Sequence, residues 1–198
     1  MSLPYFTISK PTEGLFKDRS SKFLAYSFPI TTVDDVKPLL EQLKMEHPSS
    51  RHVCYAYQLG TDGNNYRVND DGEPNGSAGL PILNQIKSKE VTNVLVAVVR
   101  YFGGIKLGVS GLVNAYKEAS KAALEKVIVV ERIPTVVISI QFPHSSIGEV
   151  ERIIRQHNFS IKHQAFGLDC KWLIEVPESE NELALELFLA VKDVDLKP

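Results

Sequence analysis

Two glycine-rich segments of this 198-residue chain combine charged residues in patterns that could do chemistry. The first, NDDGEPNGSAGLP at residues 69–81, holds Asp70, Asp71 and Glu73 among three glycines and two prolines. The second, RYFGGIKLGVSGL at residues 100–112, holds Arg100 and Lys106 among four glycines. A chain that needed only turns would not concentrate its 12 glycines in this way. The pattern predicts that the two segments form one site.

The second segment is suited to an anionic ligand. Glycine lets backbone N–H groups approach a ligand, and the N-terminus of a following helix adds partial positive charge. The spacing matches neither GxGxxG nor GxxxxGK[ST], so no standard nucleotide fingerprint applies. The alternative is a tight strand-to-helix connection that needs positive φ and close packing. The glycines concerned are Gly103, Gly104, Gly108 and Gly111, flanked by Arg100 and Lys106.

The acidic segment has several possible roles. Close carboxylates such as Asp70, Asp71 and Glu73 can bind Mg²⁺, pair with cations, or act as general acid and base. The spacing does not match a calcium loop, because the later ligands of that pattern are missing. One alternative is an acidic turn that caps a helix beginning at Ser77. Another is that the acids pair with Arg100 and Lys106 and hold the two glycine loops together.

Other reactive side chains are expected to be structural. His52 and Cys54 share one face of a strand, but residues two apart are usually too distant for a direct hydrogen bond. We therefore expect a buried cysteine near a histidine with its own partner. Trp172 and Phe159 are expected to fill the core of a second domain rather than stack on bases.

Composition indicates an ordinary globular protein, with 43% hydrophobic and 23% charged residues. The apolar runs are too short for a membrane span, and the N-terminus lacks the pattern of a secretory signal. The two cysteines show no CxxC spacing, which argues against a disulfide framework or a zinc knuckle. We expect a cytoplasmic protein with no membrane partner.

Charge is distributed unevenly along the chain. Residues 1–133 carry 16 Lys and Arg against 14 Asp and Glu, whereas residues 134–198 carry 6 against 10. This asymmetry supports two domains and places an anion-binding role in the first.

The first domain is expected to alternate strands with helices. The segments TTVDDVKPLLEQLKMEH and SGLVNAYKEASKAALEKV show apolar residues at helical spacing, the second with Ser110 as a possible cap. The apolar run TNVLVAVVRYF is typical of a central strand covered on both faces. The expected strands are 21–30, 52–60, a short one near 66–68, and 92–102; the expected helices are 31–47, one from near Ser77, and 110–127.

The last third has a different pattern. Its segments read strand 134–142, helix 145–157, strands 159–166 and 170–176, helix 179–191 and a short strand 194–196. That βαββαβ order is typical of a ferredoxin-like domain. We therefore predict an α+β protein with domains 1–133 and 134–198, separated near Pro134.

Four segments together resemble the IMPACT family and its bacterial YigZ-type branch. They are RHVCYAY, DDGEPNGSAGLPIL, TNVLVAVVRYFGGIKLG and GLVNAY, and the resemblance runs through residues 16–128. The family often has a second glycine where this chain has Ser110. Serine is also a good helix cap, so we expect the same fold with Ser110 at this position.

The resemblance implies an N-terminal domain like the second domain of ribosomal small-subunit protein 5, a β-rich sheet with two helices. Similar domains occur in elongation factor G and in several RNA-handling proteins. The resemblance also implies a ferredoxin-like C-terminal domain. Eukaryotic relatives act in translational control, and bacterial members have a suspected role in translation or RNA binding, with no agreed reaction.

Our leading hypothesis is a translation-associated regulatory protein that binds RNA or another phosphate-bearing ligand, with RNA or ribosome-associated factors as partners. Arg100 and Lys106 would contact phosphates, together with backbone amides of the glycine segment. The acids would position these cations or hold a Mg²⁺ that bridges to RNA. The predicted site comprises Asp70, Asp71, Glu73, Arg100, Gly103, Gly104, Lys106, Gly108, Ser110 and Gly111.

Two alternatives stay open. The acidic loop could serve a small metal-dependent hydrolase, although an enzymatic role is the less favoured reading. The acidic C-terminal domain could instead be the docking face of a protein-interaction adaptor.

Overall fold

The computed structural model describes residues 4–197, which divide into two compact units. The first comprises Tyr5–Arg132, and the second takes the chain from Ile133 onward. Both units combine helices with antiparallel sheets, so the mixed α and β class predicted from the sequence is confirmed.

A five-stranded antiparallel sheet forms the centre of the first unit, in the order β2-β3-β6-β4-β5. Its middle strand is the apolar run of the sequence, and it is buried along nearly its whole length. Successive side chains of this strand alternate between two core layers. The strands are β2 (Thr12–Asp18), β3 (Ser21–Pro29), β4 (His52–Leu59), β5 (Asn65–Asn69) and β6 (Val94–Tyr101).

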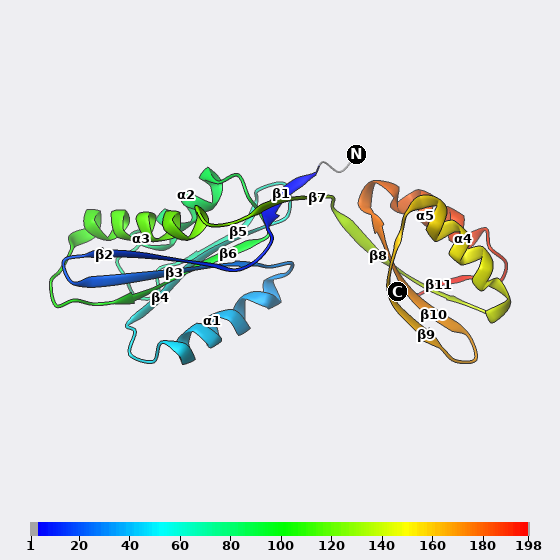
Figure 1. Ribbon diagram of the computed structural model, residues 1–198, viewed down its shortest axis with the longest axis horizontal. Helices are drawn as coiled ribbons and strands as arrows, with labels where there is room; N and C mark the ends of the chain where they lie inside the picture. Colours follow the sequence, from blue (N-terminus) through cyan, green and yellow to red (C-terminus); the bar gives the residue numbers. More distant parts are fainter. Residues whose placement is uncertain (1–3, 198) are drawn as a thin grey trace. The chain divides into compact units, whose positions relative to one another are not determined.

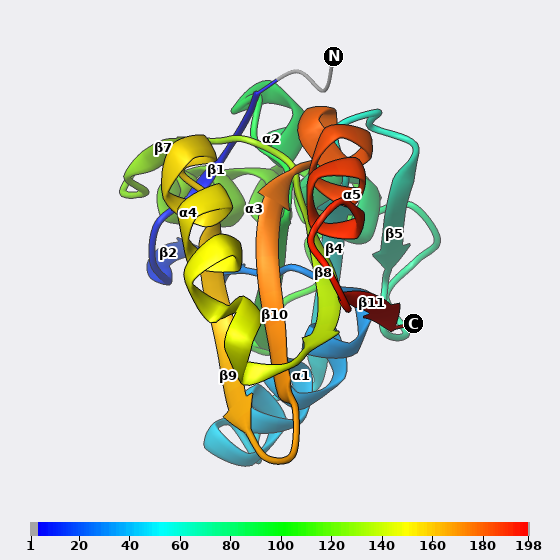
Figure 2. The same cartoon turned by 90° about the vertical axis from the view of Figure 1, so that its right-hand side faces the viewer.

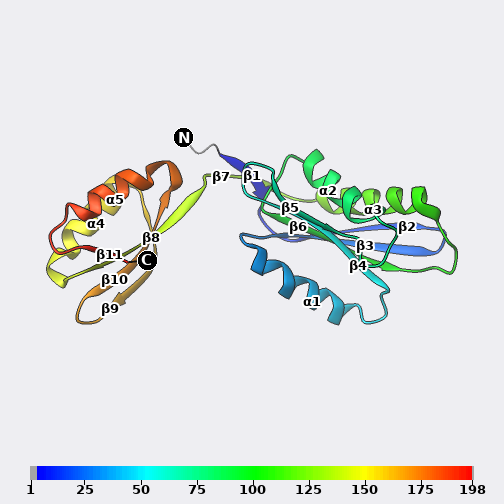
Figure 3. The same cartoon turned by 180° about the vertical axis from the view of Figure 1, so that it is seen from behind.

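Three helices cover the two faces of this sheet. Helix α1 (Val36–Glu46), which follows a 3₁₀ turn at Val33–Asp35, lies on one face. Helices α2 (Gly79–Ser88) and α3 (Gly108–Leu124) lie together on the other (Figures 1 and 3). The unit therefore has one helix more than the resemblance implies.

The starts of α2 and α3 differ from the prediction. Ser77 lies before α2, and its hydroxyl donates to the carbonyl oxygen of Pro74 at 2.6 Å. Ser110 is the third residue of α3, so it cannot cap that helix. The predicted Ser110 cap is therefore wrong, since the N-cap residue of α3 is Leu107.

Three strands of the first unit were not predicted. β1 (Tyr5–Ile8) pairs antiparallel with β7 (Val129–Arg132), which lies at the opposite end of the unit's sequence. β2 lies against α3, and a Cβ at Gly14 would come within 2.3 Å of the backbone nitrogen of Ala123. Glycine is required at this position because the strand and the helix approach so closely.

The second unit follows the predicted order βαββαβ. Its elements are β8 (Thr135–Phe142), α4 (Ile147–His157), β9 (Ser160–Phe166), β10 (Cys170–Pro177), α5 (Asn181–Leu189) and β11 (Asp195–Lys197). The antiparallel sheet has the order β11-β8-β10-β9, and both helices cover one face of it (Figure 2). Trp172 and Phe159 are buried in the core between these layers, as predicted.

Candidate functional site

The sheet topology brings the two glycine-rich segments together. β5 and β6 are both antiparallel to β4, so they run in the same direction and end at the same edge of the sheet. Residues 70–78 follow β5 and lead into α2, and residues 102–107 follow β6 and lead into α3. Since α2 and α3 lie on the same face, the two loops must meet above this edge.

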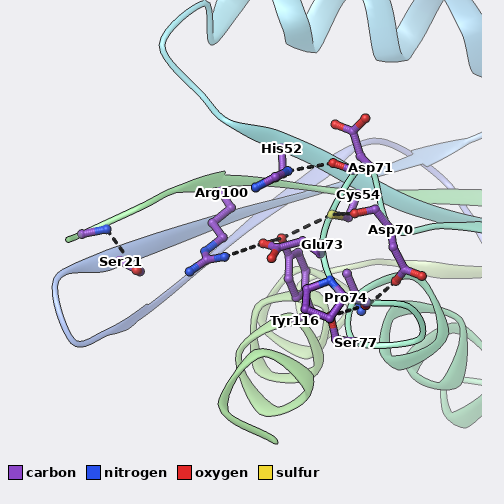
Figure 4. A network of polar contacts seen from close by, with 12 residues as sticks. Ser21, His52, Cys54, Asp70, Asp71, Glu73, Pro74, Ser77, Arg100 and Tyr116 are labelled. Atoms are coloured by element: carbon purple, nitrogen blue, oxygen red, sulfur yellow. Dashed lines mark hydrogen bonds and ion pairs between the residues drawn. The ribbon is translucent and has the colours of Figure 1, made fainter. Parts of the chain in front are cut away.

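An ion pair joins the two segments (Figure 4). The Nη1 atom of Arg100, the penultimate residue of β6, donates to Oε1 of Glu73 at 2.6 Å. Both side chains are buried, with exposed fractions of 7% and 4%. The Cζ atom of the guanidinium lies 5.4 Å from the ring centroid of Phe23 and 5.5 Å from that of Phe102. The predicted pairing of an acid with Arg100 is thus confirmed.

The pair continues into a buried polar chain. The hydroxyl of Tyr116, on α3, also donates to Oε1 of Glu73, at 2.8 Å. The Sγ atom of Cys54 lies 3.3 Å from this hydroxyl and 3.0 Å from the carbonyl oxygen of Asp70. Burial raises the pKa of the Cys54 thiol and of the Tyr116 hydroxyl well above their ordinary values. Both groups are therefore neutral hydrogen-bonding partners rather than nucleophiles.

Asp70 and Asp71 hold the acidic loop in shape. The carboxylate of Asp70 accepts hydrogen bonds from the backbone N–H groups of Gly76, Ala78 and Gly79, at 2.8 to 2.9 Å. The amides of Ala78 and Gly79 lie at the start of α2, so Asp70 caps this helix from outside it. The acidic turn that caps a helix is therefore confirmed for Asp70.

Asp71 connects the same loop to β4. Its carboxylate accepts from the backbone N–H of Val53 at 2.7 Å, and its carbonyl oxygen accepts from Nδ1 of His52 at 2.7 Å. His52 thus has its own partner and Cys54 is buried, as expected for these two residues.

The glycines of the second segment differ in role. The N–H of Gly103 donates to the hydroxyl of Ser21 at 3.1 Å, and a Cβ there would lie within 2.1 Å of the Ser20 backbone. Gly103 thus serves close packing, and its amide is already bonded within the protein. Gly104 and Gly108 have φ values of +87° and +74° with open space around the Cβ position. Their backbone groups border solvent rather than another segment.

A cavity of about 520 Å³ opens where the two loops and the start of α3 meet. Glu73 and Arg100 contribute to its wall, and Lys106, Gly108 and Val109 contribute from the second loop and the helix. The N-cap residue of α3, Leu107, provides no side-chain hydrogen bond to the first amides of the helix. The remaining residues that line the cavity are Arg51, His52, Gly72, Pro74, Phe102, Leu107 and Leu112.

Four of the ten predicted site residues line this cavity: Glu73, Arg100, Lys106 and Gly108. The other six belong to the two loops and the first turn of α3 but do not line the cavity. Lys106 is exposed and, among residues 4–197, takes part in no ion pair. The predicted pairing of Lys106 with the acidic loop is therefore wrong: Glu73 pairs with Arg100, and both aspartates bond to backbone amides.

The predicted site missed the other eight lining residues, among them Arg51 and Phe102. Arg51 precedes β4, and its N–H donates to the carbonyl oxygen of Arg100 at 3.2 Å, which places it beside the end of β6. The antiparallel pairing of these two strands could have indicated this position. Phe102 lies inside the predicted segment, and its 41% exposure for a large apolar side chain could not be read from the sequence.

The three carboxylates do not converge on one point. Each bonds to different partners, and residues 4–197 contain no group of three or more His, Cys, Asp or Glu that could hold a metal ion. A Mg²⁺ ion that bridges to RNA stays a prediction. No helix in the same part of the chain is long and apolar enough to cross a membrane.

The chain belongs to the IMPACT family. The family model described as the Impact N-terminal domain matches residues 19–124, which include both glycine-rich segments and the helix that follows each. The resemblance inferred from the sequence motifs is confirmed.

Similar proteins cover most of the chain. It is 30% identical to the IMPACT family member YvyE of Bacillus subtilis over 89% of this chain and 82% of that protein. It is 33% identical to the IMPACT family member YigZ of Escherichia coli over 76% of each. A crystal structure of a hypothetical protein superposes with a TM-score of 0.75 at 26% identity, covering 99% of this chain and 97% of that one.

Proposed function

We propose that this protein is a translation-associated regulator that binds RNA through the phosphate groups of its backbone. The observation that carries the proposal is the cavity of about 520 Å³ in which the start of α3, Lys106 and Arg51 meet. The charged or polar groups available there are those that recognise phosphate oxygens.

The start of α3 supplies the first part of this recognition. A helix of 17 residues has a partial positive charge at its N-terminus, and its first N–H groups have no partner inside the helix. Gly108 and Val109, the first two residues, line the cavity. A phosphate oxygen at this position would accept from these amides.

Cationic side chains supply the second part. Arg51 and Lys106 are exposed, line the same cavity and belong to no ion pair among the described residues. The only acidic residue in the lining is Glu73, and its charge is already balanced by Arg100. An anion in the cavity would therefore meet two cations whose charge is not neutralised.

Arg100 has a different role from the one first predicted for it. Because its Nη1 donates to Glu73 and its guanidinium contacts the rings of Phe23 and Phe102, its side chain is fixed and forms part of the cavity wall. Its Nε atom is buried without a hydrogen-bond partner among residues 4–197. A buried N–H without a partner is destabilising.

The role in translation rests on the family resemblance. IMPACT-type N-terminal domains resemble the second domain of ribosomal small-subunit protein 5 and a domain of elongation factor G. Both of these proteins act in translation. We extend this analogy to the unit Tyr5–Arg132 and assign the βαββαβ unit to the ferredoxin-like class. The sheet order β11-β8-β10-β9 supports the second assignment.

Fluorescence anisotropy of a labelled mixed-sequence RNA tests the proposal. We expect binding that weakens steeply with salt, since phosphate contacts release counterions. In Arg51→Ala/Lys106→Ala the slope of log affinity against log salt should fall by about 1.4, because each lost contact to single-stranded RNA removes about 0.7.

The matched control is Lys44→Ala/Arg67→Ala, which also removes one lysine and one arginine. Both residues are exposed and line a separate cavity beside α1. This variant should bind as the unchanged protein does. Absence of RNA binding at low salt, or an equal loss in both variants, would contradict the proposed site.

A further inference from the structure

A second cavity, of about 570 Å³, shares the lining residue Phe102 with the first. It lies on the face of the sheet that α1 covers, whereas the first lies on the face that α2 and α3 cover, so the two come together around the end of β6. The other walls of the second cavity come from the end of β2, the start of β3 and the end of β6. Its lining residues are Leu15, Lys17, Ser20, Lys22, Leu24, His47, Tyr101 and Phe102. None of them is acidic, so no carboxylate in the wall repels an anion.

Two lysines face each other in this second cavity. Lys17 on β2 is directly opposite Lys22 on β3, and Lys22 is directly opposite Tyr101 on β6. Residues directly opposite in an antiparallel sheet point to the same face, and like charges in such a pair are destabilising. Both lysines are exposed, and neither takes part in an ion pair among residues 4–197. An anionic group between them would remove this repulsion.

Two aromatic residues line the second cavity, and one of them, Phe102, also lines the first. Phe102 is 41% exposed, and its ring is held by the guanidinium of Arg100 at 5.5 Å. The neighbouring Tyr101 is held by a hydrogen bond of 2.9 Å between its hydroxyl and Nδ1 of His47. A fixed, exposed ring beside a cationic groove is the arrangement that binds single-stranded nucleic acid, because a base stacks on the ring while the backbone follows the cations.

We propose that the two cavities form one track for single-stranded RNA, which passes around the end of β6 at Phe102. Lys17 and Lys22 bind the phosphate at one end, a base stacks on Phe102, and a further phosphate binds at Lys106 and the start of α3. This inference rests on the proposed function and extends it from a single phosphate site to a strand of several nucleotides. It selects single-stranded RNA, since a base paired inside a duplex cannot stack on the ring.

A series of labelled oligouridines, from dinucleotide to octanucleotide, tests the track by anisotropy. With the unchanged protein, affinity should rise with length until the track is filled. Lys17→Ala/Lys22→Ala should bind the octanucleotide about tenfold more weakly and the dinucleotide as the unchanged protein does. Phe102→Ala should also lose about tenfold for the octanucleotide, the effect expected from one stacked base.

The matched control is Lys37→Ala/Lys44→Ala, which removes two exposed lysines of α1 and should leave every affinity unchanged. A blunt RNA duplex should bind more weakly than the octanucleotide. Equal affinity for all lengths, no effect of the Lys17 and Lys22 changes, or preference for the duplex would overturn the track and leave the first cavity as the site. Failure of every oligonucleotide to bind would instead contradict the proposed function itself.

Discussion

The ion pair between Arg100 and Glu73 is the contact on which the candidate site depends. It joins the acidic loop to the end of β6, and Tyr116 adds a third element by donating to the same carboxylate oxygen. The two charged side chains are almost fully buried, and each neutralises the charge of the other. A buried charge without such a partner would be strongly destabilising. The geometry of the cavity wall follows from this contact.

Removal of one partner should be far more damaging than removal of both. Glu73→Ala leaves the Arg100 guanidinium buried without its counterion, and it should lower the free energy of unfolding by about 3–5 kcal/mol. The double change Glu73→Leu/Arg100→Met replaces the pair with apolar side chains and should be clearly less destabilising. Urea denaturation of the two variants measures both values. A loss below about 1 kcal/mol in Glu73→Ala would contradict a buried, coupled pair.

The buried thiol of Cys54 makes stability depend on pH. Burial raises its pKa, so the folded state keeps the proton at pH values where the unfolded state loses it. The stability is therefore complete below about pH 8.5, the ordinary thiol pKa, and falls as the pH rises above it.

Urea denaturation under reducing conditions between about pH 7 and about pH 10 checks this expectation. Cys54→Ala should be less stable at pH 7, since it leaves a small cavity, but its stability should fall less at alkaline pH. Parallel stability curves for the two proteins would show that the thiol titrates normally.

Among the elements, α2 depends on a residue that lies well before it in the sequence. Asp70 accepts three backbone hydrogen bonds, two of them from Ala78 and Gly79 at the start of the helix. We expect Asp70→Ala to lower the free energy of unfolding by about 2 kcal/mol, at the upper end of the range for a lost N-cap. Thermal denaturation of this variant provides the measurement.

Asp71→Ala is the control for that experiment. Asp71 is a neighbouring residue whose carboxylate accepts one hydrogen bond, from the N–H of Val53. Asp71→Ala should therefore be less destabilising than Asp70→Ala. An equal fall in melting temperature for the two variants would contradict the capping role of Asp70.

The long, regular elements could be predicted from the sequence, because their signals are local. The helix at 36–46 follows from its apolar stripe, and the strand at 94–101 follows from its continuous apolar run. β1 and β7 could not be predicted, because each has four residues and they pair across more than a hundred positions of sequence. Such pairing is decided by the tertiary fold rather than by local preference.

Local sequence signals likewise predicted part of the candidate site, whereas contacts between distant segments could not be predicted. The clustering of charge and glycine indicated Glu73, Arg100 and Lys106, and all three line the cavity. The roles of Gly103 and Arg51 depend on neighbours far away in sequence, the Ser20 backbone and the end of β6. Sequence spacing does not carry this information.

At the scale of the whole molecule, all residues of the two cavities that share Phe102 belong to the unit Tyr5–Arg132. The positive excess of the sequence also lies in residues 1–133, whereas residues 134–198 carry the acidic excess. The unit is closed by the β1–β7 pair, which connects its two ends. We therefore expect the first unit to fold and bind RNA without the second.

Truncation tests this independence. A chain that ends at Arg132 should unfold in one cooperative transition, because it keeps its own core and the β1–β7 pair. A chain that ends at Ile128 lacks β7 and should melt several degrees lower. Circular dichroism on heating gives both transitions. Loss of cooperative unfolding in the longer fragment would show that the first unit depends on the second.

Titration of the ¹⁵N-labelled protein with single-stranded RNA, followed by backbone amide NMR, tests the central claim most directly. If phosphate binds at the start of α3, the amide resonances of Lys106, Gly108 and Val109 should move with RNA concentration. The amide of Gly103, which already donates to Ser21, should move less. Shifts confined to residues 133–197, or no shifts at low salt, would contradict RNA binding in this cavity.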